Sequence, residues 1–257
     1  MAPEDRTGIE SARTAAPQDI PRLLLSSGED TLRSLIENLR FDETHVCLLL
    51  ERKDLSGAFI EEVAKRKDWR GIYRVRRALA AHPHTPRQLA IRVLRELHLM
   101  DLVRISLLPS SSGELKRLAE ERVLAQLPQI PLGQRIMLAR RGSARVAAGL
   151  VLQGPEQVAR IALDNPFLNE AQLLKTLSKD SLAARTVGSV ARHEKWSKLV
   201  NVRIVLLRHS HAPADCVAAL VLDLPRRDIE DLLELSRLSK GVRDQLRQEL
   251  AHRDLQV

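Results

Sequence analysis

Aromatic side chains are scarce in this chain of 257 residues, at 2% of the composition, although hydrophobic residues make up 44%. Leucine, alanine, valine and isoleucine must therefore fill the core, and side chains of this size suit the packing of helix on helix. Strand-forming residues are few, and the alternation of apolar and polar residues typical of strands is absent. We therefore expect an all-α protein without a sheet.

Long apolar runs are absent as well. The longest, such as residues 217–222, are far shorter than the roughly 20 residues of a membrane helix. The N-terminal stretch lacks the apolar segment of a signal peptide, and its Pro, Ala, Ser, Thr and Asp content predicts a disordered tail over residues 1–18. The only two cysteines, Cys47 and Cys216, lie among apolar neighbours, which favours buried, reduced thiols over a disulfide. These features favour a cytoplasmic protein without a membrane anchor.

A helical hairpin motif is present in two copies and one looser relative. VRRALAAHPHTPRQLAIRVL at residues 75–94 returns as VRIVLLRHSHAPADCVAALVL at residues 202–222, and VARIALDNPFLNEAQLLKTL occupies residues 158–177. Val-Arg-x-x-Leu-x-x-His begins both full copies, and each continues into His-x-His-x-Pro. This recurrence is typical of an α-helical repeat protein.

The first copy has the residues expected at a turn between two helices. The proline after His82 predicts the end of the first helix, because the residue before a proline avoids the α conformation. Thr85 is placed to cap the second helix with its hydroxyl, and Pro86 suits the first helical position. His209 and Pro213 hold the corresponding places in the second copy.

Turn signals near residues 82, 109, 142, 165 and 193 lie 23 to 33 residues apart, a spacing typical of stacked helical hairpins. Such hairpins cannot bury their apolar faces alone and therefore stack into one continuous core. The stretch 226–254 contains seven basic and seven acidic residues, a polar balance that suits capping helices. We predict a single α-solenoid domain over residues 19–257.

The stretch RRALAAHPHTPRQL at residues 76–89 resembles HEAT-like repeats and the bacterial leucine-rich repeat variant family. The resemblance covers residues 73–97, 158–177 and 202–222. It implies a right-handed α-solenoid of stacked hairpins, in which Arg76 and Arg203 each bridge to an acidic residue of the neighbouring repeat. Some leucine-rich repeat variant proteins carry an iron–sulfur centre on an N-terminal cysteine cluster. This chain has one cysteine in that half, so the centre is not expected.

The paired histidines of each His-x-His motif allow two interpretations. They are metal ligands, or they are turn residues whose imidazoles bond to backbone carbonyls at a helix end. The pairs lie 127 residues apart, and no further His or Cys pair completes a zinc site. Adjacent carboxylates, the other candidates for chemistry, point in different directions on a helix. We expect no metal, no cofactor and no catalytic residues.

Basic residues are the strongest functional signal. The net charge is +8, and 32 of the 41 basic residues are arginine, whose forked side chain binds phosphate and carboxylate bidentately. The bias also has a neutral explanation in the base composition of the genome. The predicted binding residues are Arg74, Arg77, Arg92, Arg95, Arg140, Arg141, Lys195, Lys198 and Arg208. The positions predicted to hold the repeats are Arg76, His82, Thr85, Pro86, Arg203, His209 and Pro213.

These features favour a non-enzymatic interaction module, a monomer, that presents a basic concave face to an acidic protein partner. A nucleic-acid-binding protein that contacts phosphates with the same face is the alternative. A DNA-repair glycosylase is a third interpretation, since some such enzymes are built from HEAT-like repeats. The few aromatic residues provide poorly for stacking on bases.

Overall fold

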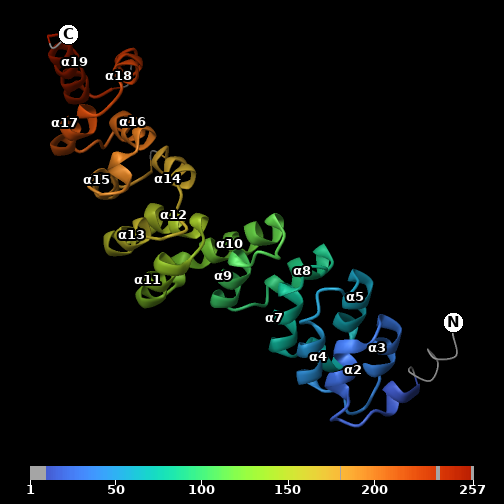
Figure 1. Cartoon of the computed structure of the whole chain (residues 1–257). Coiled ribbons are helices and arrows are strands. Elements are labelled where there is room, and N and C mark those ends of the chain that lie inside the picture. Colours follow the sequence, from blue (N-terminus) through green and yellow to red (C-terminus); the bar gives the residue numbers. More distant parts are fainter. Residues whose placement is uncertain (1–9, 180, 236–237, 256–257) are drawn as a thin grey trace. The chain divides into compact units, whose positions relative to one another are not determined.

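The computed structural model describes residues 10–179, 181–235 and 238–255, and this part of the chain contains helices and no strand (Figure 1). The prediction of an all-α fold is confirmed. No helix in the described ranges combines the length and the apolar character needed to cross a membrane. The chain divides into two compact units, residues 1–123 and 124–257. Our prediction of one domain over residues 19–257 did not distinguish these units.

The first unit is built from short amphipathic helices. They are α2 (Ile20–Ser26), α3 (Glu29–Leu35), α4 (Glu43–Leu49), α5 (Gly57–Lys65), α6 (Lys67–Arg70), α7 (Tyr73–Ala81), α8 (Arg87–Leu94), α9 (Leu99–Leu107) and α10 (Gly113–Gln126), whose last turn passes into the second unit. α2 packs against α3 and α4, and α7 packs against α4, α6, α8 and α9. Phe41, Phe59 and Trp69 are buried here among aliphatic side chains.

The N-terminal stretch joins this unit earlier than expected. We predicted a disordered tail over residues 1–18, of which residues 1–9 lie outside the described residues. Residues 10–14 are helical, and Ala12 is fully buried. Asn38 Nδ2 donates to Ala12 O and Ala15 O, at 3.1 Å each. Residues 10–15 therefore belong to the folded unit.

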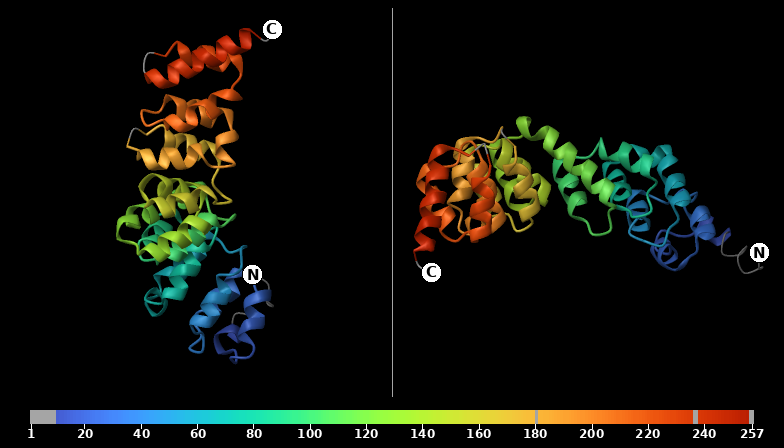
Figure 2. Two further views of the ribbon diagram at one scale, coloured as in Figure 1. Left: turned by 90° about the vertical axis from the view of Figure 1, so that its left-hand side faces the viewer. Right: turned by 90° about the horizontal axis from the view of Figure 1, so that it is seen from above.

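The second unit contains η1 (Leu127–Gln129), α11 (Leu132–Arg141), α12 (Ala144–Gln153), α13 (Glu156–Leu163), α14 (Glu170–Leu177), α15 (Ala184–Ala191), η2 (Trp196–Lys198), α16 (Val200–Arg208), α17 (Ala214–Leu222), α18 (Arg226–Leu233) and α19 (Lys240–Asp254). From α11 to α17, each α-helix packs against the second α-helix after it along the chain, and successive helices lie close together in Figure 2. α18 and α19 pack together at the predicted capping stretch, where residues 236–237 lie outside the described residues.

In both units, polar side chains close the C-terminal ends of earlier helices. The last carbonyls of a helix have no partner within it. In the first unit Arg52 Nη1 donates to Leu24 O and Ser27 O at the end of α2, at 2.7 Å each. In the second unit Asn165 Nδ2 donates to Ala139 O at 2.8 Å and to Gly142 O at 3.1 Å. Donors and acceptors are 23 to 28 residues apart in these examples, close to the spacing of the turns.

The turn of the first hairpin differs in detail from the prediction. Thr85 does not cap α8: its Oγ1 donates backward to Leu79 O at 2.6 Å. Pro86 occupies the N-cap position of α8 and not the predicted first helical position, and Pro213 occupies the N-cap position of α17. α8 therefore begins one residue later than the sequence indicated. The Thr85 hydroxyl stabilises the end of α7 and not the start of α8.

Candidate binding clefts

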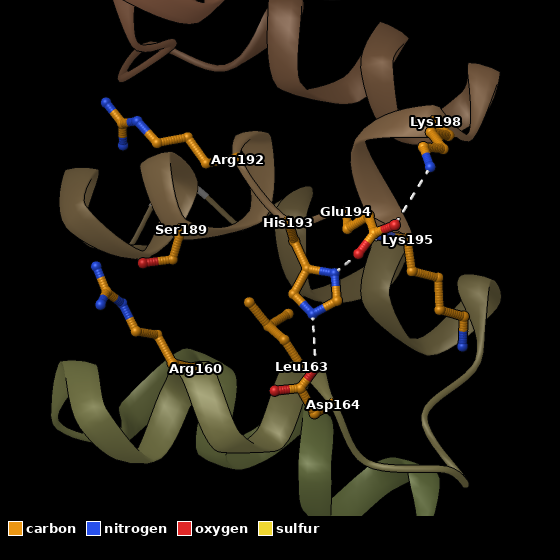
Figure 3. A pocket seen from close by; sticks show the side chains of 9 residues that line it. All are labelled: Arg160, Leu163, Asp164, Ser189, Arg192, His193, Glu194, Lys195 and Lys198. Carbon is orange, nitrogen blue, oxygen red and sulfur yellow. Dashed lines mark hydrogen bonds and ion pairs between the residues drawn. The ribbon is translucent and has the colours of Figure 1, made fainter.

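The second unit carries an open cleft of about 850 Å³ between the C-terminal ends of α13 and α15 and the η2 turn (Figure 3). Its cationic side chains are Arg160, Arg192, Lys195 and Lys198, and its acidic ones are Asp164 and Glu194. Counted over these arginine, lysine, aspartate and glutamate side chains, the lining carries two net positive charges. The volume falls within the range of ligand-binding clefts.

Two of these arginines follow the same short sequence. Val-Ala-Arg occurs at residues 158–160 and again at residues 190–192. The valine and alanine are buried in both cases, and Arg160 lies within α13 whereas Arg192 is the C-cap of α15. Figure 3 shows both guanidinium groups on the same side of the cleft, with Ser189 between them. Two neighbouring helices therefore present two arginine forks on one side of the cleft.

A buried tryptophan fixes the opposite wall. Trp196 is 1% exposed, and its Nε1 donates to Leu163 O at the end of α13, at 2.8 Å. His193 Nδ1 accepts from Lys195 N at 3.2 Å, and His193 Nε2 lies 3.1 Å from Asp164 Oδ1. The Lys195 ammonium lies 4.1 Å from the centre of the Trp196 ring, a cation–π contact. These contacts hold the lysine-bearing turn against α13.

Ion pairs hold three of the four cations loosely. Arg160 Nη2 lies 3.1 Å from Glu156 Oε1, Arg192 Nη2 lies 2.6 Å from Asp215 Oδ2, and Lys198 Nζ lies 3.7 Å from Glu194 Oε1. The Arg192 guanidinium lowers the pKa of the Asp215 carboxyl through this hydrogen bond. All three cationic side chains are more than half exposed, so each pair contributes little to stability and can exchange its partner. Lys195 has no carboxylate partner within the described part of the chain.

A second cleft, of about 490 Å³, lies in the first unit and is lined by residues of α5, α6, α7 and α8 and of the turns beside them. Its floor is apolar, and Arg92 is one of its lining residues. This apolar floor distinguishes it from the cleft of the second unit.

The predicted binding residues divide among several places. Lys195 and Lys198 line the cleft of the second unit, and Arg92 lines that of the first. Arg74 lies 3.7 Å from Glu43, and Arg77 lies 3.9 Å from Asp101. The remaining residues are exposed and line neither cleft: Arg95, Arg140, Arg141 and Arg208. The predicted face is therefore not one continuous site within either unit.

The repeat positions carry structural contacts. Arg203 Nε donates to Ser197 O at 2.6 Å, and its Nη2 donates to Asp223 at 2.9 Å. Arg76 likewise bonds to Gly71 O and Glu96. Both acids lie 20 residues after their arginine, in the same hairpin. The partner that the resemblance implied, an acid of the neighbouring repeat, is corrected accordingly.

The histidines of the first hairpin bond to backbone carbonyls. His82 Nε2 lies 2.6 Å from Arg52 O, and His84 Nδ1 lies 2.7 Å from Leu55 O. Burial lowers the pKa of the His82 imidazole, which favours its neutral form. This agrees with the interpretation of His82 as a turn residue. In the described part of the chain, no three His, Cys, Asp or Glu side chains are grouped as a metal site requires.

The sequence interpretation missed Arg160 as a member of the cleft. Val-Ala-Arg recurs 32 residues further on, but Arg160 lies within α13 and Arg192 is the C-cap of α15, so this recurrence does not predict that the two arginines share a cleft. Both cysteines are free, and Cys216 is buried while Cys47 is partly exposed.

No protein-family model, no curated protein and no solved structure matches the chain. The resemblance to HEAT-like repeats and the leucine-rich repeat variant family stays a prediction.

Proposed function

We propose that this chain is a right-handed α-solenoid of HEAT-like hairpins that binds an acidic protein partner without catalysing a reaction. The observation that carries the proposal is the cationic cleft of residues 124–257. There, Arg160 of α13 and Arg192 at the end of α15 line the cleft together with two lysines on a turn that a buried tryptophan fixes. Such a cleft recognises carboxylates through charge-assisted hydrogen bonds.

Two features support the solenoid, the first in the second unit and the other in both units. The helices of the second unit pack against their second neighbours along the chain, as stacked hairpins do. Donors on later segments also close helix ends at a regular sequence separation. Within residues 1–123 these donors include Asn38, Arg52 and His82, and within residues 124–257 they include Asn165 and Trp196.

The charge distribution favours a protein partner over nucleic acid. Many described arginines already contact carboxylates, among them Arg33, Arg76, Arg87 and Arg192, so phosphates would have to compete with these acids along the surface. Trp69 and Trp196, which stand next to Arg70 and Lys195 in the sequence, are both buried and cannot stack on bases. A mixed surface of cations and acids suits a protein interface with charges of both signs.

The test compares an acidic peptide with oligonucleotides. We expect the full chain to bind a fluorescent glutamate-rich peptide, measured by anisotropy. Lys195→Glu combined with Lys198→Glu should weaken binding roughly tenfold, because two attractions become repulsions of about 0.2–1 kcal/mol each. The matched control is Lys175→Glu with Lys240→Glu, which reverses two exposed lysines outside the cleft and should change affinity less than about twofold.

Equal losses in the two double variants would remove the cleft as the binding site. Labelled duplex and single-stranded oligonucleotides are titrated at low and at near-physiological salt. Binding of these probes that survives the higher salt, with no binding of the peptide, would replace the proposal by the nucleic-acid alternative.

A further inference from the structure

The cleft of the first unit combines an apolar floor with a charged rim. Leu79 and Val93 form buried parts of the floor, and Ala64 and Leu89 are half-buried beside them. The space is about 490 Å³, enough for a bulky side chain together with part of the segment that carries it. Covering the half-buried apolar surface would release water from it and favour association.

The rim of this cleft is predominantly cationic. Five basic side chains line it against two acidic ones, Glu61 and Glu96. Glu61 lies 3.2 Å from Lys65, Glu96 pairs with Arg76, and Arg87 is held bidentately by Glu114. Arg70 and Arg92 are exposed and have no carboxylate partner within the described part of the chain. These two guanidinium groups are therefore free to bind carboxylates of another molecule.

We propose that this cleft docks an acidic segment of a partner protein that inserts one bulky aliphatic side chain into the floor. The floor accounts for the aliphatic group, and Arg70 and Arg92 account for acidic residues on either side of it. The inference shares its class of partner with the proposed function but rests on different residues in a different unit.

This chemistry excludes two simpler occupants. A nucleic-acid backbone would satisfy the arginines but leave the apolar floor uncovered. A purely apolar segment would cover the floor and bring no acid to Arg70 and Arg92, whose partial desolvation would then oppose binding. An acidic segment with an aliphatic anchor satisfies both parts of the cleft.

The experiment uses two labelled peptides that differ at one position. Both are glutamate-rich, and the central residue is leucine in one and alanine in the other. We expect the full chain to bind the leucine peptide about tenfold more tightly, because the larger side chain buries more apolar surface. Ala64→Phe, which fills the floor, should abolish this preference. Circular dichroism verifies that each variant is folded.

Charge reversal tests the rim independently of the floor. Arg92→Glu should weaken binding of both peptides about five- to tenfold. Arg104→Glu is the matched control, because Arg104 is an exposed arginine of the same unit that does not line the cleft. It should change the affinity less than about twofold.

The outcomes separate this inference from the proposed function. Equal affinity for the two peptides, or equal losses in Arg92→Glu and Arg104→Glu, would overturn the docking site. If the Lys195 and Lys198 reversals still weakened binding, the proposed function would stand without this docking site. A leucine preference that Ala64→Phe removes, with no effect of the lysine reversals, would support this site and overturn the cleft of the second unit.

Discussion

In the hairpin at residues 75–94, His82 Nε2 lies 2.6 Å from Arg52 O, whereas the corresponding nitrogen of His209, in the copy at residues 202–222, is buried without a partner among the described residues. The turn contact is the same in both. His82 Nδ1 accepts from His84 N at 3.2 Å, and His209 Nδ1 accepts from His211 N at 3.1 Å. The motif therefore specifies its own turn, while the bond to an earlier segment depends on whether that segment places a carbonyl within reach of the histidine.

For the arginines, it is the second copy that has the more buried side chain. The side chain of Arg203 is 9% exposed and that of Arg76 is 25% exposed. Each bonds to a carbonyl just before its own helix and to an acid after the second helix of its hairpin. The first copy is therefore held more firmly through its histidine, and the second through its arginine.

The largest expected effect concerns Arg203. Arg203→Ala removes two charge-assisted hydrogen bonds and the packing of a buried side chain, and should lower the free energy of unfolding of the second unit by about 3 kcal/mol. Arg76→Ala should cost the first unit about 1.5 kcal/mol, because this side chain is more solvated. Each unit contains one tryptophan. Denaturant unfolding in a Trp69→Phe background reports the second unit, and in a Trp196→Phe background it reports the first.

The control for this pair is Arg208→Ala, on the exposed side of the same helix as Arg203, with an expected loss below about 0.5 kcal/mol. Equal losses for Arg203→Ala and Arg76→Ala would show that burial does not distinguish the two arginines.

A smaller effect is expected at the histidines. His82→Ala should cost about 2 kcal/mol, because it leaves Arg52 O without its partner and opens a small cavity. His209→Ala should cost about 1 kcal/mol, because its Nε2 makes no bond to lose. His82→Asn should recover part of the loss, since Asn38 and Asn165 make both contacts, to an earlier carbonyl and to their own turn. The same single-tryptophan unfolding measures all three, and an equal cost for the two alanine variants would contradict the comparison.

The sequence was sufficient to predict an all-α fold and to place the turn at His82, because hydrophobic periodicity and proline positions are local signals, but it placed the start of α8 one residue too early. It indicated His82 as a turn residue for the same reason. The acceptors could not be predicted: Arg52 O and Leu163 O are backbone atoms that every residue type supplies. The division of the cations between Lys195 in one cleft, Arg92 in another and Arg140 in neither depends on tertiary packing, which single-sequence spacing does not contain.

The smallest expected effect comes from a turn residue that the two copies do not share. Thr85 donates to Leu79 O, whereas the corresponding residue of the second copy is Ala212. Thr85→Ala should cost the first unit about 1 kcal/mol, the usual net value of one hydrogen bond. Ala212→Thr should stabilise the second unit by a few tenths of a kcal/mol, up to about 1, if its hydroxyl reaches Leu206 O, the equivalent carbonyl. Unfolding measured with each unit's tryptophan tests both changes, and a loss of stability in Ala212→Thr would show that the two turns differ in backbone geometry as well as in sequence.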